Sequence, residues 1–202
     1  MKQSLLHRLI TTAFLTLALA SQSFAAGFHY QLDLTAKLVS NAEGKLQAIQ
    51  MSWLYDKELS SILMDGEDLS ESKRDATLKR RAADILSGLK DAKYFTIALL
   101  DQKALKFNKV EHYKLRLIKE SRLQMNLTLP LAQPQTLKGH ELALIVTDDS
   151  GVGLATFIDT NHMLLGESFS KICQAPKLLQ KKQAEVDGHA QVVETMTISC
   201  SQ

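Results

Sequence analysis

The stretch FHYQLDLTAKL, residues 28–38, carries an apolar side chain at every second position. One face of the extended chain is therefore apolar, and it consists of Phe28, Tyr30, Leu32, Leu34, Ala36 and Leu38. The other face is polar and begins with His29. Because a period of two is typical of a half-buried β-strand, this stretch predicts a strand that covers a core.

The same alternation returns in LQAIQMSWLY, residues 46–55, after a turn that contains Asn41 and Gly44. Residues 28–55 are therefore expected to form a β-hairpin. The apolar spacing then changes to that of a helix in residues 56–66, where Asp56 is placed to cap and Gly66 to end it. Residues 70–92 predict a second, amphipathic helix that Ser70 or Ser72 opens and that ends near Gly88.

Alternating stretches resume after Lys93 and continue to the C-terminus. Residues 140–149 and 151–158 are expected to pair across a short turn. The stretch RLQMNLTLPL, residues 122–131, alternates most regularly, and Pro130 and Pro134 are expected to end this strand or place it at a sheet edge. Eight or nine strands with one helical insertion predict a mainly β (α+β) fold. It is expected to be a single, antiparallel β-sandwich-like domain, with the helices between the second and third strands.

Residues 1–25 have the pattern of a secretory signal peptide. Lys2 and Arg8 precede an apolar run of 12 residues, and small residues follow at the expected cleavage site. Spanning a bilayer takes about 20 apolar residues, so we expect no integral membrane segment in the mature chain. Residues 26–202 are then expected to form one periplasmic domain. The full chain has a net charge of +2, which the leader accounts for, and a neutral domain argues against a nucleic-acid partner.

Cys173 and Cys200 are the two cysteines of the chain. In an exported protein, an even number of cysteines favours a disulfide bond between them. The alternative is a pair of thiolate metal ligands, although no CxxC motif accompanies them.

Five histidines remain after the expected leader, and none has the HxH, HxxxH or HExxH spacing of a metal site. His162 is the best candidate in a loop, because Asp159 lies three residues before it and a carboxylate can orient an imidazole for a metal. His29 is a second candidate, because it lies near the expected new N-terminus. No nucleophile elbow, P-loop or dinucleotide fingerprint is present, so we expect no enzymatic activity.

Several stretches together resemble a family of bacterial periplasmic proteins, domain of unknown function 1007, also described as an uncharacterised ABC-type transport system, periplasmic component. They are FHYQLDL, AIQMSWLYDKELSSILMDGEDL, DAKYFTIALLDQKALKF, RLQMNLTLPLAQPQTLKGHELALIVTDDS and ETMTISC. Members of this family are commonly encoded beside nickel/cobalt-type inner-membrane permeases, and roles in zinc or nickel handling have been suggested. The resemblance therefore implies an accessory to divalent-metal transport, with such a permease as its partner.

The chain departs from this family at two places. The mature chain of the family typically starts with a His-Pro-His motif, whereas Gly27, Phe28, His29 and Tyr30 stand here. The acidic, EF-hand-like segment is reduced to DGEDLSESKRD, residues 65–75. Cleavage after Ala26 would instead create a Gly27-Phe28-His29 terminus, whose amine, amides and imidazole suit Cu(II) or Ni(II).

Two functions follow as expectations. The first is a non-enzymatic periplasmic accessory of a zinc-, nickel- or cobalt-type transport system, with His29, His162 and Asp159 as candidate ligands of zinc, nickel or copper. The alternative is a structural or protein-interaction module of the envelope that binds no metal.

Overall fold

The computed structural model describes residues 29–182 and 191–201, so the expected signal peptide lies outside the described residues. Within the described part, no helix is both long and apolar enough to cross a membrane. The elements in chain order are β1 (Tyr30–Ser40), β2 (Leu46–Tyr55), α2 (Lys57–Met64), α3 (Arg74–Leu89), η1 (Lys93–Phe95), β3 (Thr96–Leu100), β4 (Lys103–Ala104), β5 (Tyr113–Leu117), η2 (Lys119–Ser121), β6 (Leu123–Gln135), β7 (Glu141–Thr147), β8 (Gly153–Thr156), η3 (Thr160–His162), β9 (Met163–Leu164), α4 (Gly166–Ser170), β10 (Lys177–Lys182) and β11 (Val192–Ser199).

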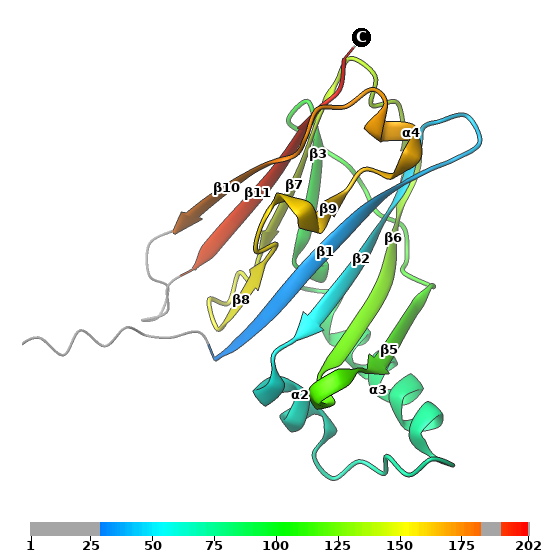
Figure 1. Ribbon diagram of the computed structural model, residues 1–202, viewed down its shortest axis with the longest axis vertical. Coiled ribbons are helices and arrows are strands. Elements are labelled where there is room, and N and C mark those ends of the chain that lie inside the picture. The colour runs from blue at the N-terminus through cyan, green and yellow to red at the C-terminus, as the bar shows by residue number, and fades with distance from the viewer. Residues whose placement is uncertain (1–28, 183–190, 202) are drawn as a thin grey trace, which may run out of the picture.

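The strands form two sheets that face each other (Figure 1). Sheet A has the order β5-β6-β2-β1-β8, and β9 also pairs with β1. Sheet B has the order β10-β11-β7-β3-β4. The prediction of a mainly β, sandwich-like domain is confirmed, as is the β1–β2 hairpin, in which Leu34 pairs with Trp53.

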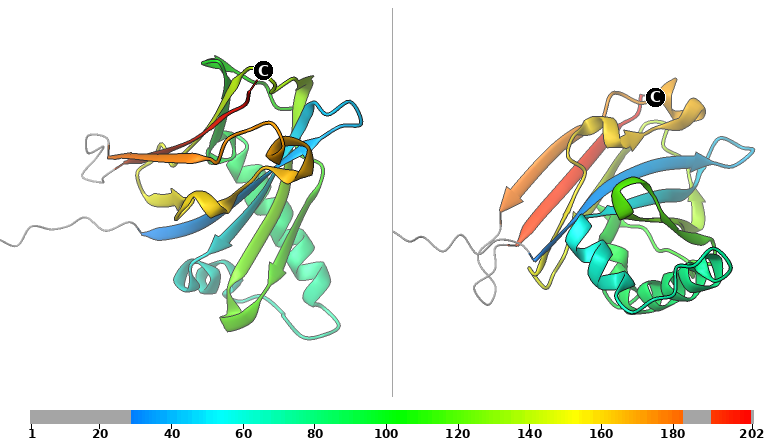
Figure 2. Two further views of the ribbon diagram at one scale, coloured as in Figure 1. Left: turned by 45° about the horizontal axis from the view of Figure 1, so that its top comes forward. Right: turned by 60° about the horizontal axis from the view of Figure 1, so that its bottom comes forward.

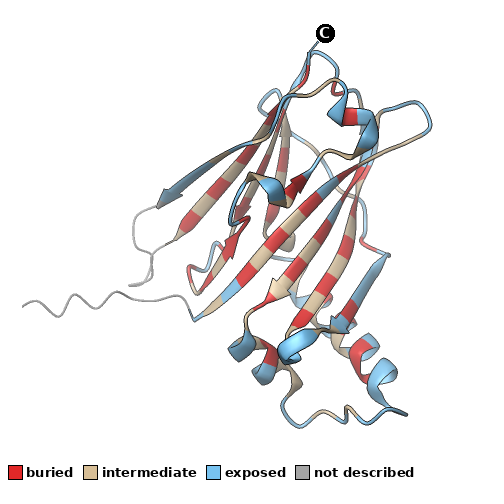
Figure 3. Cartoon of the chain, in the orientation of Figure 1, coloured by how far each residue is buried: buried red, intermediate tan, exposed pale blue. Residues whose placement is uncertain are grey.

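Burial alternates along the strands of both sheets (Figure 3). The core lies between their inner faces, where the side chains are almost wholly excluded from water: Leu32, Leu34, Ala36, Met51, Trp53, Met125, Leu127 and Leu129 from sheet A, and Ala98, Leu142, Leu144, Val146, Met196 and Ile198 from sheet B. Each strand keeps polar or partly exposed residues on its outer face, as the period of two requires.

The helices α2 and α3 follow β2 directly and lie at one end of the molecule (Figure 2). The side chain of Asp56 caps α2 by accepting a 2.7 Å hydrogen bond from Leu59 N, and its other oxygen accepts one from Gln31 N. Leu78, Ala82 and Leu86 of α3 face the core. The predicted helical insertion is therefore confirmed, although α3 begins at Arg74 after Lys73 rather than at Ser70 or Ser72, and no side chain caps it.

The two prolines do not end the strand that contains them, because β6 runs through Pro130 and Pro134 to Gln135. The backbone N–H groups of Thr128 and Ala132 point away from β2, toward the carbonyls of His112 and Lys106. Pro130 lies midway between them, so its missing N–H also faces that side. No ladder bond to β2 is lost, which is why this proline is tolerated inside a sheet.

The expected pairing of residues 140–149 with residues 151–158 is wrong. Strand β7 lies in sheet B, whereas β8 crosses to sheet A and pairs in parallel with β1. The side chain of Asp148 holds the turn between these two strands. One carboxylate oxygen accepts hydrogen bonds from the backbone N–H and the hydroxyl of Ser150. The other oxygen accepts one from Gly153 N and one from the Tyr30 hydroxyl. Tyr30 of β1 therefore bonds to the turn that leads into β8, a contact between residues 118 positions apart that no local pattern could reveal.

Candidate functional site

The loop between β8 and β9 carries the aspartate–histidine pair that the sequence singled out. Asp159 caps η3 by accepting a 2.8 Å hydrogen bond from Asn161 N. The same carboxylate oxygen lies 2.8 Å from Nδ1 of His162. The side chains of both residues are substantially exposed, so the structure brings two of the three predicted ligands together at the surface.

The hydrogen bond has an electrostatic consequence for Asp159. It is the largest cause that holds the pKa of the Asp159 carboxyl below its ordinary value, so this group stays negatively charged. A charged carboxylate accepts a hydrogen bond from Nδ1–H, and in that tautomer the lone pair of the ring lies on Nε2. This arrangement is the one in which metal-binding histidines are usually held.

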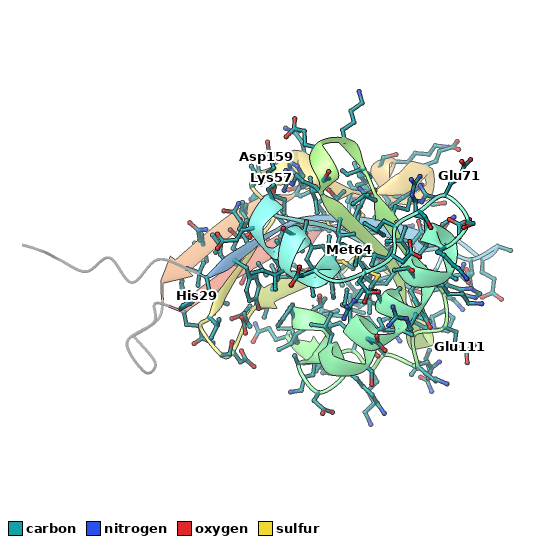
Figure 4. The ribbon with its side chains drawn as sticks, turned by 90° about the horizontal axis from the view of Figure 1, so that it is seen from below. His29, Lys57, Met64, Glu71, Glu111 and Asp159 are labelled. Carbon is teal, nitrogen blue, oxygen red and sulfur yellow. A yellow bond between two sulfur atoms is a disulfide. The ribbon has the colours of Figure 1, made fainter. Side chains whose placement is uncertain are left out.

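His29 does not join this pair. It lies just before β1, and its backbone N–H donates a 2.8 Å hydrogen bond to the carbonyl of Val152. Tyr30 pairs with Gly153, whereas Ala36 pairs with Met163 next to His162. Six residues of extended chain span about 20 Å, and the labels of His29 and Asp159 are well apart in Figure 4.

A second aspartate–histidine pair was missed by the sequence reasoning. Nδ1 of His140 lies 2.5 Å from the Asp101 carboxylate, and the other oxygen of Asp101 accepts a hydrogen bond from Glu141 N. The backbone bond from Glu141, followed by the bond to His140, lowers the pKa of Asp101. The two partners are 39 positions apart and meet because β3 pairs with β7, so no sequence spacing could have indicated the pair.

The described residues contain no group of three or more His, Cys, Asp or Glu side chains that could hold a metal ion. A structural zinc site has four protein ligands and a catalytic one usually has three. Each aspartate–histidine pair supplies fewer, so these residues do not fit a resident metal centre.

Glu194 is a buried acid at an inward position of β11, where the alternating pattern of the strand predicts an apolar residue. One carboxylate oxygen accepts 2.7 Å hydrogen bonds from the Thr156 hydroxyl and the Gln180 amide. The other accepts a 2.7 Å bond from Phe157 N. Glu194 therefore joins sheet B to the start of the loop that carries Asp159. Both of its carboxylate oxygens accept hydrogen bonds from the protein itself.

Cys173 and Cys200 form a disulfide bond, as predicted. The same two residues form an isolated antiparallel bridge, and the backbone of Ser201 bonds to Ile172. The bond therefore joins the end of β11 to the chain just before β10, and the thiolate-ligand alternative does not apply.

One row on the outer face of sheet B is mostly apolar. The pairing register places Leu179, Thr195, Ile145 and Ile97 in one row across β10, β11, β7 and β3. Their strand neighbours Met196, Leu144 and Ala98 point into the core, so the row faces outward. It contains no charged residue, and Leu179 is 53% exposed. Apolar faces of this kind are typical of protein-interaction surfaces.

The two facing sheets, the helical insertion and the disulfide define a single-domain β-sandwich protein. Residues 12–193 match the family described as Protein of unknown function (DUF1007), and the chain belongs to this family. No curated protein matches the chain. Among solved structures it is similar to AChBP from Bulinus truncatus, with 12% identity and a TM-score of 0.28 over 85% of this chain and 86% of that one.

Proposed function

We propose that this protein is a non-enzymatic periplasmic accessory of a divalent-metal transport system of the zinc, nickel or cobalt type. It holds the metal ion as cargo at its surface and delivers it to an inner-membrane permease. Family membership supports this proposal, because the resemblance implies a nickel/cobalt-type permease as the partner.

The observation that carries the proposal is the hydrogen bond between Asp159 and Nδ1 of His162. It leaves Nε2 of the partly exposed imidazole as the nitrogen that an incoming ion would bind. A site with so few protein ligands releases the ion easily once a partner protein supplies the remaining metal ligands. His140 with Asp101 is a second site of the same construction.

Isothermal titration of Zn(II), Ni(II) and Cu(II) into untagged protein purified from the periplasm tests this role. We expect the H162A and H140A variants each to lose one site. Because outer partners of metal-binding histidines typically contribute 10- to 100-fold in affinity, Asp159→Asn is expected to weaken the His162 site by about tenfold. His112→Ala is the matched control, because this histidine is also exposed and lies in the segment just before β5.

Native mass spectrometry of the same samples reports the metal stoichiometry and the first residue of the mature chain. Unchanged metal affinity in the double variant lacking His140 and His162 would contradict the proposal. Loss of binding on His29→Ala alone would place the metal at the N-terminus instead.

A protein-interaction module is the second candidate, and the apolar row on sheet B favours it. A photo-crosslinking residue at position 145, in the middle of that row, is expected to capture a partner protein in living cells. The same residue at position 133, on the exposed end of β6, serves as the control. Capture at both positions alike would count against a specific interface on sheet B.

A further inference from the structure

A hollow of ≈ 540 Å³ lies on the outer face of sheet A. This volume is within the range of small-molecule sites, which is about 300–1,000 Å³. Its floor is formed by β1, β2 and β6. The segment that leads into β5 borders it at the β6 side, and β9 borders it at the β1 side. Neither His162 nor Asp159 lines it.

The pairing register arranges the floor in two rows. Thr35 pairs with Ser52, Ser52 with Asn126, and Asn126 with Lys114. In the next row, Lys37 pairs with Gln50 and Gln50 with Thr128. Neighbouring strands lie about 4.8 Å apart, so the first row spans about 14 Å across the sheet.

The middle of the floor is uncharged and rich in hydrogen-bonding groups. The side chains of Thr35, Gln50, Asn126 and Thr128 have no hydrogen bond to any other described residue, and that of Ser52 bonds to Gln124. Hydroxyl and amide groups both donate and accept hydrogen bonds. The floor is therefore more complementary to the hydroxyls of a ligand, which also donate and accept hydrogen bonds, than to a bare anion, which only accepts them.

The charged residues stand at opposite sides of this floor. Lys37 lies on β1, Lys114 lies on β5, and both are exposed. His112 is beside Lys114, and Glu111 is the sole acid among the residues that line the hollow. Cations at two separated positions favour a ligand that carries negative groups along its length.

One exposed apolar side chain borders the hollow. Leu164 of β9 is 46% exposed and pairs with Lys37, whereas Tyr113 pairs with the buried Leu127 and so faces the other side of sheet A. Apolar and aromatic walls with a few directed polar groups are the usual composition of ligand sites. The C–H face of a sugar ring is a suitable partner for Leu164, whereas its hydroxyls suit the floor.

We propose that this hollow binds an elongated anionic saccharide whose hydroxyls bond to the floor and whose carboxylates or phosphates reach Lys37 and Lys114. A second protein copy fits less well. A stable protein interface covers about 800 Å² of each partner with a largely apolar centre, whereas the centre here is polar. This ligand site is independent of the proposed metal role.

The test uses tetragalacturonate as the probe and ¹⁵N-labelled protein purified from the periplasm, with EDTA present so that metal binding plays no part. We expect backbone amide shifts centred on Thr35, Gln50, Asn126 and Thr128. Isothermal titration is expected to show affinity at least tenfold lower for K37Q/K114Q and at least fivefold lower for N126A. Neutral cellotetraose is expected to bind at least tenfold more weakly than the anion.

The matched control is K103Q/K177Q, which removes two exposed lysines from the edges of sheet B and changes the net charge equally. An equal loss of affinity in this control would overturn the site, since the attraction would then be non-specific. Absence of shifts on the floor at millimolar tetragalacturonate would overturn it as well. A concentration-dependent dimer, detected by sedimentation, that protects the amides of the floor would also overturn the proposal. It would identify a second copy of the protein as the occupant.

Discussion

Gly153 lies at the start of β8, where the chain has crossed from sheet B to sheet A. A Cβ atom at this position would lie 2.0 Å from two ring carbons of Tyr30. That ring is held in place because its hydroxyl donates a 2.6 Å hydrogen bond to Asp148. Burial, followed by this bond, raises the pKa of Tyr30 well above its ordinary value, so the hydroxyl remains a donor.

We therefore predict that Gly153→Ala lowers the free energy of unfolding by about 1–3 kcal/mol, the usual cost of overpacking. Urea denaturation measures it. Gly88→Ala is the matched control: its Cβ would meet nothing within 4 Å, and it lies in α3. Because alanine is the better helix former, the control is expected to be neutral or slightly stabilising. Equal effects of the two substitutions would show that the contact with Tyr30 is not the cause.

The aspartate–histidine pair gives a second prediction for single residues. Because His162 is the largest cause of the lowered pKa of Asp159, H162A is expected to raise that pKa toward its ordinary value. A lowered carboxyl pKa in the folded state contributes stability above the unfolded pKa, and this contribution is lost as the pH falls through the folded pKa. Carboxyl ¹³C NMR follows the titration, with His112→Ala as control. A pKa that stays low in H162A would mean that backbone donors such as Asn161 N dominate.

At the scale of elements, Glu194 is the side chain that joins the two sheets. Its carboxylate accepts from Thr156, Phe157 and Gln180, which belong to β8, the following loop and β10. Glu194→Ala leaves the buried donors of Thr156 and Phe157 without a partner, and each such loss costs about 1–3 kcal/mol, whereas the exposed Gln180 can bond to water.

We predict that E194A destabilises the fold by roughly 3 kcal/mol, because unsatisfied buried donors are costly. Chemical denaturation provides the measurement. Glu141→Ala is the control, since this exposed acid bonds to one serine hydroxyl and its removal is expected to cost no more than about 0.5 kcal/mol. If E194A and Glu141→Ala were equally stable, the hydrogen bonds of Glu194 would not contribute measurably to the stability of the fold.

For the whole molecule, the disulfide closes a long segment that contains β10 and β11. Cys173 and Cys200 are 27 positions apart. A loop of this length restricts the unfolded chain, so removing the bond with C173S/C200S is expected to cost about 3 kcal/mol. Thermal and urea unfolding with and without reductant measure this. Reductant is expected to destabilise the natural chain and leave the double variant unchanged; equal sensitivity of the two would contradict the prediction.

Much of the architecture is contained in local patterns. Alternation of apolar residues along residues 30–38 indicated which side chains of β1 enter the core, whereas Phe28 lies outside the described residues. Asp56 marked the start of α2 at the correct residue. The two cysteines indicated their own bond. The strand and helix patterns depend on neighbours within a few positions, and each cysteine has only the other one to pair with. These features can therefore be predicted without knowledge of the fold.

The rest was decided by tertiary structure. The turn that leads into β8 is joined to β1 by Tyr30 and Asp148, which are 118 positions apart. Strand β10, the Asp101–His140 pair and the two polar rows on sheet A likewise exist because distant strands lie side by side. The sequence by itself determined which face of each strand is apolar, because that is a property of a residue and its neighbours. Only the folded molecule determined which strands meet, because long-range hydrogen bonds and side-chain packing select among strands whose local patterns are alike.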